Sequence, residues 1–587
     1  MGALGKMGTI LLYFVLAVCV AHAADEALVG ELNLAEDATT RLTVRELRIS
    51  GNTLVSTSDL LDYMPAIYNA SGQPLTRADA QYLYDLTVIR DIVANPGAPR
   101  EVSIRTIQGL TQYILSVYQK NDYSGIFVYV PEGALTADMQ LIDGVLPIII
   151  LEAPVTDVRI KYFDIDRKEV EQGHLRRSAL ESWSPIERNK VASQRSLDYL
   201  VNLLNLNPDR HVSAVVSRAD EPNSLAIEYN IYETNPWHFF IQADNSGTSD
   251  RQWSPRIGLI NTNLAGYDDR FTVLYQASPD STFDENYSVF GSYDFPVRGP
   301  RLRVNLYGGY SEFDINPESG PFSFLGSGTF YGGVLRYNAF QDQGWFFDVL
   351  GSWSHEESQI NPSLFPQFLA SDVEMDLLGV GANMYRRDDM ANTSLAVNWV
   401  ESIGRTNQAD FNQARTNAEP EFSILTAAAN HSQYMDRKKV QQLRATVRWI
   451  DPSDRLVPAK MTSFGGMYSV RGYDEYEIVA DGGILASIQY EYDLIKHGQA
   501  VDAPVVANKE VKKLAPLAFF DFGRTTIEDP VVGDPDVHET LASVGVGTAF
   551  EIGNNFSGAI YYGYPLKATD DTREGKGRLN ASAMLRW

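Results

Sequence analysis

The last ten residues, RLNASAMLRW (578–587), alternate strictly between polar and apolar side chains. Successive side chains of a β-strand point to opposite faces, so one face is apolar and the other carries arginine and asparagine. The apolar face holds Leu579, Ala581, Ala583, Leu585 and Trp587, opposite Arg578, Asn580, Ser582 and Arg586. A soluble sandwich would turn the polar face to solvent, whereas a membrane barrel would line a wet lumen with it and turn the apolar face to lipid.

The same alternation recurs through residues 236–587. RLRVNL (301–306) and QLRATVRW (442–449) belong to about sixteen runs of roughly 8 to 14 residues, with no convincing helical period between them. Strands that cross a bilayer need about 9–11 residues, whereas globular strands average about 5–6. An even number of long strands leaves no unpaired edge once the sheet closes. We therefore predict a mainly β protein with a 16-stranded antiparallel transmembrane barrel.

The end of the chain predicts how this barrel closes. Trp587 is both the last residue of a strand and the last residue of the sequence. The final strand must then pair with the first, which we place near residues 239–243. We assign Leu585 and Trp587 to barrel closure and to a C-terminal signal.

Residues 1–23 have the pattern of a secretory signal peptide. Lys6 precedes the apolar run TILLYFVLAVCV (9–20), and Ala21-His22-Ala23 offers a cleavage site. The single cysteine, Cys19, lies in this segment, so we expect no disulfide in the mature chain. Residues 24–41 form a short N-terminal segment.

Composition and motifs exclude several functions. A formal charge of −26 argues against nucleic acid as a partner, because nucleic-acid-binding proteins need basic patches. No apolar run after residue 20 approaches the length of a transmembrane helix. We find no G-x-S-x-G, no H-E-x-x-H, no P-loop and no Cys/His cluster. We expect no enzymatic activity, no cofactor and no metal, although an exported enzyme on a β scaffold stays open as an alternative.

Two mixed α/β modules precede the barrel, over residues 42–153 and 154–234. In the first we expect a strand at 42–49, a short helix opened by Ser58-Asp59, a Pro/Gly loop at 92–100, a helix with Ile107, Leu110, Ile114 and Val117 on one face, and strands at 126–130 and 145–153. In the second we expect a strand at 155–163, a helix at 195–206 and strands at 212–217 and 225–232. This order repeats without sequence identity, although one irregular α+β domain remains an alternative.

Two motifs in the barrel region carry a family resemblance. Val470-Arg471-Gly472-Tyr473 resembles the signature of a long loop folded into a barrel lumen, and Phe519-Phe520-Asp521-Phe522-Gly523 resembles the F-x-D-x-G signature on the next strand but one. QLIDGVLPIIILEAPVTDVRI (140–160) and the segment 242–278 add to it. With these features in this order, the chain resembles two-partner secretion transporters of the TpsB class, of the haemolysin secretion/activation type.

The resemblance implies an architecture and a set of partners. It implies two polypeptide-transport-associated (POTRA) domains in the periplasm, a barrel in the outer membrane, and an inward-folded loop at 452–482. The implied partners are a secreted exoprotein bound by the POTRA domains, outer-membrane lipid, and the barrel-assembly machinery during biogenesis. The implied function is export of the unfolded exoprotein, and insertion of other barrel proteins into the membrane is the alternative within the same fold.

The chemistry of the two motifs predicts a contact between them. Phe519, Asp521 and Gly523 share one face of a strand, and a carboxylate facing lipid would be costly, so this face lines the lumen. Arg471 offers a planar fork matched to a carboxylate. We therefore expect Arg471 to pair with Asp521, Gly472 to permit a sharp turn, Gly523 to leave room for the loop, and Tyr473 to pack on Phe519. A surface arginine and a locally bonded aspartate are the alternative.

Overall fold

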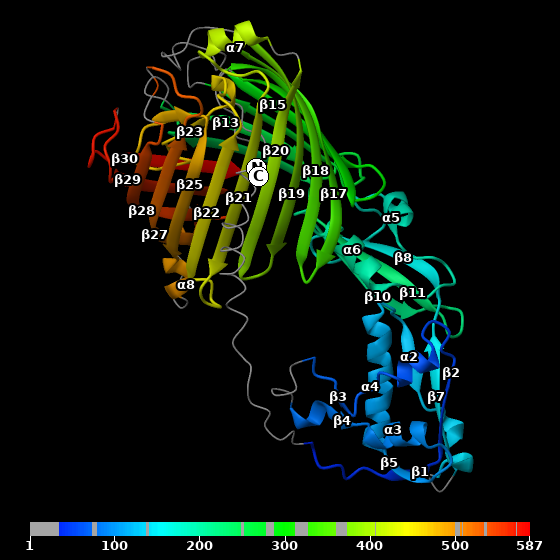
Figure 1. Ribbon diagram of the computed structural model, residues 1–587. Helices are drawn as coiled ribbons and strands as arrows, with labels where there is room; N and C mark the ends of the chain where they lie inside the picture. Colours follow the sequence, from blue (N-terminus) through cyan, green and yellow to red (C-terminus); the bar gives the residue numbers. More distant parts are fainter. Residues whose placement is uncertain are drawn as a thin grey trace. The chain divides into compact units, whose positions relative to one another are not determined.

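A computed structural model describes most of the chain, which clusters into two compact units (Figure 1). The described residues are 34–72, 79–136, 140–247, 252–277, 287–311, 327–359, 372–404, 407–498, 505–506, 509–532, 534, 537–570 and 572–587. The first unit holds residues up to Arg159 together with Pro185–Asp198 and Ala214–Tyr229. The second holds Ile160–Ser184, Tyr199–Ser213 and Asn230–Trp587. The predicted signal peptide, 1–23, lies outside the described residues.

The first module mixes short strands with helices. Its elements are β1 (Arg41–Val44), β2 (Glu46–Ser50), α2 (Thr57–Leu61), β3 (Ile67–Asn69), the 3₁₀ turn η3 (Ala80–Tyr82), β4 (Leu83–Asp85), α3 (Thr87–Ala94), β5 (Arg100–Ser103), α4 (Ile104–Lys120), β6 (Ile126–Tyr129), the 3₁₀ turns η4 (Glu132–Ala134) and η5 (Ile142–Gly144), and β7 (Val145–Glu152). Three of its strands form a sheet in the order β2-β7-β6, and β1 pairs with β5 and β3 with β4.

The predicted amphipathic helix is confirmed as α4. Ile107, Leu110 and Ile114 are buried on one face, and Val117 packs at the edge of the same core. Ser103 caps the helix by accepting a hydrogen bond from the backbone N–H of Thr106. Fully buried leucine and isoleucine side chains of β7 form the other wall of this core.

Glu152, at the end of β7, ties the sheet to α4 and to the loop before α2. Its Oε1 accepts hydrogen bonds from the Tyr118 hydroxyl at 2.7 Å and from the backbone N–H groups of Thr53 at 2.8 Å and Leu54 at 2.9 Å. The Thr53 hydroxyl donates to Oε2. Burial alone would raise the pKa of Glu152, but the bond from the Thr53 hydroxyl and the three bonds to Oε1 stabilise the carboxylate and hold its pKa below the ordinary value. The same carboxylate and burial raise the pKa of Tyr118.

The second module is a four-stranded sheet with helices. Its elements are β8 (Val155–Phe163), β9 (Glu169–Val170), α5 (Arg177–Trp183), α6 (Gln194–Leu204), β10 (Arg210–Arg218) and β11 (Leu225–Glu233), and the strand order is β10-β11-β8-β9. The predicted strand at 155–163 and the predicted helix near 195–206 are confirmed. On β11 the odd-numbered residues from Leu225 to Ile231 are buried, as the alternation indicated.

A closed antiparallel barrel of sixteen described strands follows, which confirms the predicted fold class. The strands are β12 (Trp237–Asp244), β13 (Arg256–Asn261), β14 (Arg270–Gln276), β15 (Ser288–Pro296), β16 (Leu302–Ser311), β17 (Ser327–Asp342), β18 (Trp345–Gln359), β19 (Asp372–Arg387), β20 (Ala391–Gly404), β21 (Ser423–Tyr434), β22 (Gln441–Pro452), β25 (Gly482–Tyr492), β27 (Lys509–Thr526), β28 (Thr540–Ile552), β29 (Phe556–Pro565) and β30 (Arg578–Arg586). Neighbours in sequence pair throughout, and the two-residue strand β26 (Val505–Val506) extends the edge of β27.

The last strand closes the barrel against the first. Five residue pairs join β12 to β30, from Phe240 opposite Arg586 to Asp244 opposite Ser582. Leu585 lies opposite Ile241. Trp587 extends the seam through backbone hydrogen bonds with Phe239 at 2.9 and 3.2 Å, and the two rings lie 5.5 Å apart. The predicted closure near residues 239–243 is therefore confirmed.

The two faces of the barrel wall differ as the alternation predicts. On β16 and β17, Leu306 and Leu335 face outward and are about half exposed, whereas Tyr307 and Val334 face inward and are buried. Apolar side chains on the outer face are what a lipid-facing wall requires. Among the described residues, no helix is long and apolar enough to cross a membrane.

Three local expectations were wrong. The strand expected at 42–49 is split at Arg45 into β1 and β2, which pair with different strands, β5 and β7. The loop expected at 92–100 begins later, because α3 continues to Ala94. The barrel region was expected to lack helices, but α7 (Gln408–Ala414) and α8 (Leu494–Gly498) lie in its loops at opposite ends of the barrel (Figure 1). These helices are too short for a periodicity argument.

Candidate functional site

The chain between β22 and β25 folds back into the barrel. It contains the 3₁₀ turn η6 (Pro458–Lys460) and a short hairpin of β23 (Thr462–Phe464) and β24 (Ile478–Ala480). Phe464, Val470, Tyr473 and Ala480 are fully buried and form a small apolar core with Leu541 of β28. We call residues 453–481 the luminal loop, because its partners lie on the inward faces of the barrel strands.

Arg471 lies at the tip of the luminal loop and binds Asp521 of β27 with two prongs. Its Nε donates to Asp521 Oδ2 at 2.7 Å, and its Nη2 donates to Oδ1 at 2.8 Å. The backbone N–H of Arg471 also donates to Oδ2, at 3.1 Å. The carboxylate is fully buried and the arginine side chain is 11% exposed. A bidentate charge-assisted pair in a nearly dry setting is the strongest kind of side-chain contact that an arginine makes.

Neighbouring strands complete the shell around this pair. Arg471 Nη1 donates to Gln489 Oε1 at 2.6 Å, and its Nη2 donates to Ser487 Oγ at 3.2 Å. The Ser487 hydroxyl in turn donates to Asp521 Oδ1 at 2.6 Å. The guanidinium carbon lies 3.5 Å from the ring centroid of Phe519, so the cation also stacks on an aromatic face. Arg471 therefore contacts β25 and β27 together.

Gly472 and Gly523 stand where the backbone of the loop meets the wall. Gly472 has a φ of +100°, and a Cβ there would lie 2.9 Å from the carbonyl carbon of Gly563 on β29. A Cβ on Gly523 would lie 3.0 Å from Val470 Cγ2. Gly472 therefore needs glycine, and Gly523 leaves room for the close approach of Val470.

Tyr473 does not pack on Phe519, so this expectation was wrong. Its ring belongs to the apolar core of the luminal loop, beside Phe464 and Leu541. Its hydroxyl donates to the backbone carbonyls of Ala542 and Lys567, at 3.0 and 2.8 Å. The face of Phe519 is occupied by Arg471 instead, with Tyr561 at its edge.

Sequence reasoning missed two further contacts of the luminal loop. Tyr468 donates from its hydroxyl to Asp244 Oδ2 on β12, at 2.8 Å, and Asp474 accepts from Arg578 Nη1 on β30, at 3.0 Å. Asp244 and Arg578 flank the seam that closes the barrel. Tyr468 sits two residues before the motif, but nothing in its local pattern indicates a partner 224 residues away.

Two further ion pairs that sequence reasoning missed hold the two ends of the luminal loop, at Arg455 and Asp481. Arg415, just after α7, forms a buried ion pair with Asp481, whose oxygens also accept from the backbone N–H groups of Leu456 at 2.9 Å and Glu528 at 3.0 Å. Arg455 pairs through both prongs with Asp534, at 2.6 and 2.8 Å. Burial alone would raise the pKa of Asp534, but the hydrogen bond and charge of Arg455 lower it.

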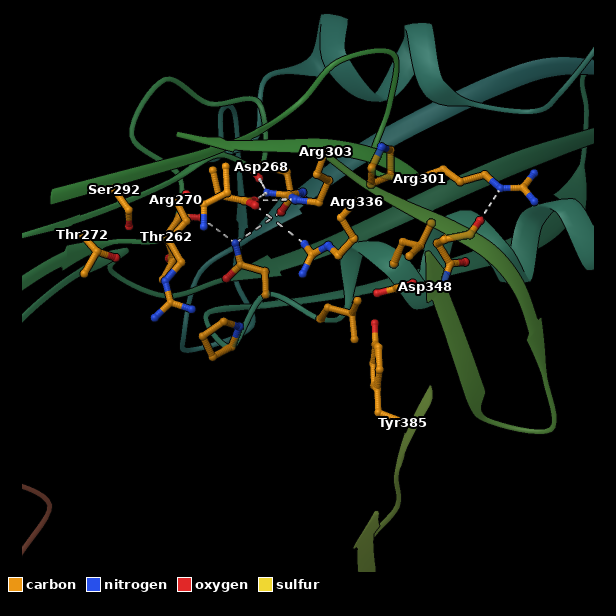
Figure 2. A pocket seen from close by; sticks show the side chains of 18 residues that line it. Thr262, Asp268, Arg270, Thr272, Ser292, Arg301, Arg303, Arg336, Asp348 and Tyr385 are labelled. Carbon is orange, nitrogen blue, oxygen red and sulfur yellow. Dashed lines mark hydrogen bonds and ion pairs between the residues drawn. The ribbon is translucent and has the colours of Figure 1, made fainter. Parts of the chain in front are cut away.

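The opposite end of the barrel carries a polar pocket, drawn in Figure 2. It is lined by the inward residues of β14 to β19 and by the segment after α6, including Arg270, Arg301, Arg303, Arg336, Asp348 and Tyr385. In the part of the chain that the structure describes, no group of three or more His, Cys, Asp or Glu side chains could hold a metal ion. The described residues of the luminal loop and of the pocket therefore present hydrogen-bonding and charged groups to the lumen.

Comparison with known proteins agrees with this architecture. The structure of CdiB from Escherichia coli aligns with a TM-score of 0.65 at 14% identity, covering 100% of this chain and 98% of that chain. CdiB from Acinetobacter baumannii aligns with a TM-score of 0.59 at 16% identity, covering 99% of this chain and 98% of that chain. At these identities the two structures show a shared fold. A comparison with curated protein sequences gives no match.

The family comparison goes further than the fold. The family described as haemolysin secretion/activation protein ShlB/FhaC/HecB matches residues 226–550, which is more than half of the chain and includes both motifs around Arg471 and Asp521. The resemblance to two-partner secretion transporters is thereby confirmed. The chain belongs to the ShlB/FhaC/HecB family of haemolysin secretion/activation proteins and is a TpsB-type outer-membrane secretion transporter.

Proposed function

We propose that this transporter exports an unfolded exoprotein through its barrel, with the two α/β modules acting as POTRA domains in the periplasm. The observation that carries the proposal is the luminal loop held against the wall by Arg471 and Asp521. Burying an ion pair costs desolvation energy, and a loop with a purely structural role could be held to the wall by apolar contacts alone. The pair fixes one wall of a path that a polypeptide can follow.

Capture of the exoprotein would use the free strand edges of the first module. The sheet order β2-β7-β6 leaves β2 and β6 at its edges. On β6, Phe127 and Tyr129 are nearly half exposed and lie on the same side of the strand. An extended segment can add to such an edge through backbone hydrogen bonds, with apolar side chains seated on the exposed aromatic rings.

Passage through the lumen needs no nucleotide in this proposal. The polar inner face can exchange hydrogen bonds with an extended backbone, and folding of the exoprotein outside the cell supplies the directional free energy. Lipid surrounds the outer face of the barrel, and the barrel-assembly machinery inserts the chain into the outer membrane.

Secretion of the exoprotein with and without this chain tests the proposal. Arg471→Ala should abolish secretion while the barrel stays folded, as judged by heat-modifiable gel mobility. Arg437→Ala is the matched control, because Arg437 is exposed in a turn between β21 and β22. Normal export by a well-assembled Arg471→Ala variant would contradict the role of the pair. General loss of other outer-membrane barrels on deletion would favour an assembly function instead.

A further inference from the structure

The pocket in Figure 2 concentrates guanidinium groups on the inner wall near the turns that join β13 to β14 and β15 to β16. Register places Arg270 opposite Asp294, and Arg303 opposite Arg336, so these side chains share the inward face. Thr272, Ser292 and Asn305 add neutral polar groups to the lining. This end of the barrel follows directly from β11, so in the proposed orientation it faces the periplasm.

Most carboxylates of the pocket are already occupied. Asp268 accepts from Arg210 Nη1 at 2.6 Å and from Arg303 Nη1 at 2.7 Å. Asp294 accepts from Arg303 Nε at 2.6 Å. Asp348 accepts from Asn338 Nδ2 at 2.6 Å. Asp268 and Asp294 therefore neutralise Arg210 and Arg303, whereas Asp348 is held by a neutral amide.

Arg301 also lines the pocket, but it donates to the backbone carbonyls of Asn338 at 2.8 Å and Ala339 at 2.7 Å. Arg270 and Arg336 are therefore the arginines of the pocket whose guanidinium groups keep donors free. Within the described residues, the Arg270 side chain makes no hydrogen bond and no ion pair, and it is exposed to the pocket. Arg336 forms a long ion pair of 3.8 Å with Asp294 Oδ2 and makes no side-chain hydrogen bond in the same described part of the chain. Two guanidinium groups with free donors thus face one pocket on the wall of the lumen.

We propose that this pocket is a docking site for the carboxylate of an acidic side chain in the passing exoprotein, held between Arg270 and Arg336. Guanidinium groups bind carboxylates with two matched hydrogen bonds. A singly charged carboxylate fits better than a dianion, because Asp294 and Asp348 line the same pocket. The inference rests on the proposed function, since the lumen is taken as the path of an extended polypeptide.

A peptide-binding measurement on the full-length protein in detergent tests the site. The probe is a short fluorescent Gly/Ser peptide that carries several glutamates, and its matched control carries glutamines instead. We expect Arg270→Gln/Arg336→Gln to raise the Kd of the glutamate peptide about tenfold, and to leave that of the glutamine peptide unchanged. Arg437→Gln removes the same charge from an exposed turn at the same end of the barrel and should change neither Kd.

A second variant places the peptide on the wall. Ser292 lines the pocket, and the sequence has one cysteine, Cys19, in the predicted signal peptide. Ser292→Cys should form a disulfide faster with a glutamate peptide whose single cysteine is activated as a mixed disulfide with thionitrobenzoate than with its glutamine counterpart. The introduced thiolate attacks the peptide sulfur and thionitrobenzoate leaves, so no other oxidant is needed. Equal Kd values for the double variant and the unmodified protein, or equal trapping of the two peptides, would overturn the inference. Export of the exoprotein is measured separately, so a transporter that secretes normally without this preference refutes the pocket and leaves the proposed function standing.

Discussion

Arg471→Ala should destabilise the folded barrel by about 3 kcal/mol, because it leaves the buried carboxylate of Asp521 without its cation. In the structure this carboxylate is fully buried and receives three hydrogen bonds from Arg471. The variant keeps the backbone N–H bond and the hydrogen bond from Ser487, but it loses both guanidinium prongs. It also removes the cation from the face of Phe519, which is a smaller loss.

The size of the effect follows from what remains around Asp521. Removing one partner of a buried ion pair typically costs about 3–5 kcal/mol, because the other charge stays desolvated. The remaining bonds to Asp521 place this case at the lower end. A loss of about 3 kcal/mol lowers the ratio of folded to unfolded protein by about a hundredfold, which a barrel of sixteen strands can tolerate. Loss of secretion and retention of the fold are therefore compatible.

Urea unfolding of the purified protein in detergent micelles, followed by tryptophan fluorescence, measures the loss. A double-mutant cycle with Asp521→Ala isolates the pair, and we expect the double variant to be less destabilised than the sum of the two single variants by about 2 kcal/mol. Arg444→Ala is the control on the same inner wall. Its partner Glu491 lies 3.4 Å away and Arg444 is 45% exposed, so that loss should stay below about 1 kcal/mol. Additivity of the two single variants within about 0.5 kcal/mol would refute the ion pair as the source of the effect.

Gly472→Ala should lower the urea midpoint by the equivalent of about 1–3 kcal/mol, because φ is +100° and the new Cβ would press on the backbone of Gly563. Gly351→Ala is the control, because a Cβ at that position would have no atom within 4 Å. Equal urea midpoints for the two variants would contradict the tight approach of the loop to β29. Asp481→Asn should increase the frequency of single-channel openings in planar bilayers, because it weakens the ion pair that holds one end of the luminal loop; unchanged gating would assign Asp481 to stability alone. The depressed pKa of Glu152 means that its contribution to stability is complete above its ordinary pKa and is lost as the pH falls through the lowered value. The hydrogen-exchange protection factors of the α4 amides, which correct for the intrinsic pH dependence of exchange, should therefore fall in acid. Glu152→Gln should flatten that fall, and protection factors with the same pH dependence in both proteins would contradict it.

The barrel could be predicted from the sequence because side-chain alternation and strand length are both read from short stretches of residues. Alternation in 578–587 and in similar runs places apolar side chains on one face, and strand length separates a bilayer wall from a globular sheet. The pair of Arg471 and Asp521 could also be predicted, since an inward carboxylate in a barrel wall needs a cation and the loop motif supplies one.

Other parts of the site could not be predicted, because their partners are set by the closed barrel. Tyr468 reaches Asp244 only once the last strand has closed on the first, and no local periodicity reports that juxtaposition. The predicted packing of Tyr473 on Phe519 is wrong for a related reason. A tyrosine beside a phenylalanine motif suggests ring packing, but Arg471 already covers that ring and the tyrosine hydroxyl finds backbone carbonyls.

The contacts of the luminal loop bear on how it can act during export. The loop holds β27 through Arg471, and it contacts β12 and β30 through Tyr468 and Asp474. The seam between β12 and β30 has only five residue pairs, whereas β17 and β18 share fifteen. Withdrawing the whole loop would break a buried ion pair and, at the same time, remove two supports from the shortest pairing in this comparison. A loop that stays in place avoids both costs. Under the proposed function, the exoprotein would then pass between the luminal loop and the strands that carry Arg270 and Arg336, β14 and β17.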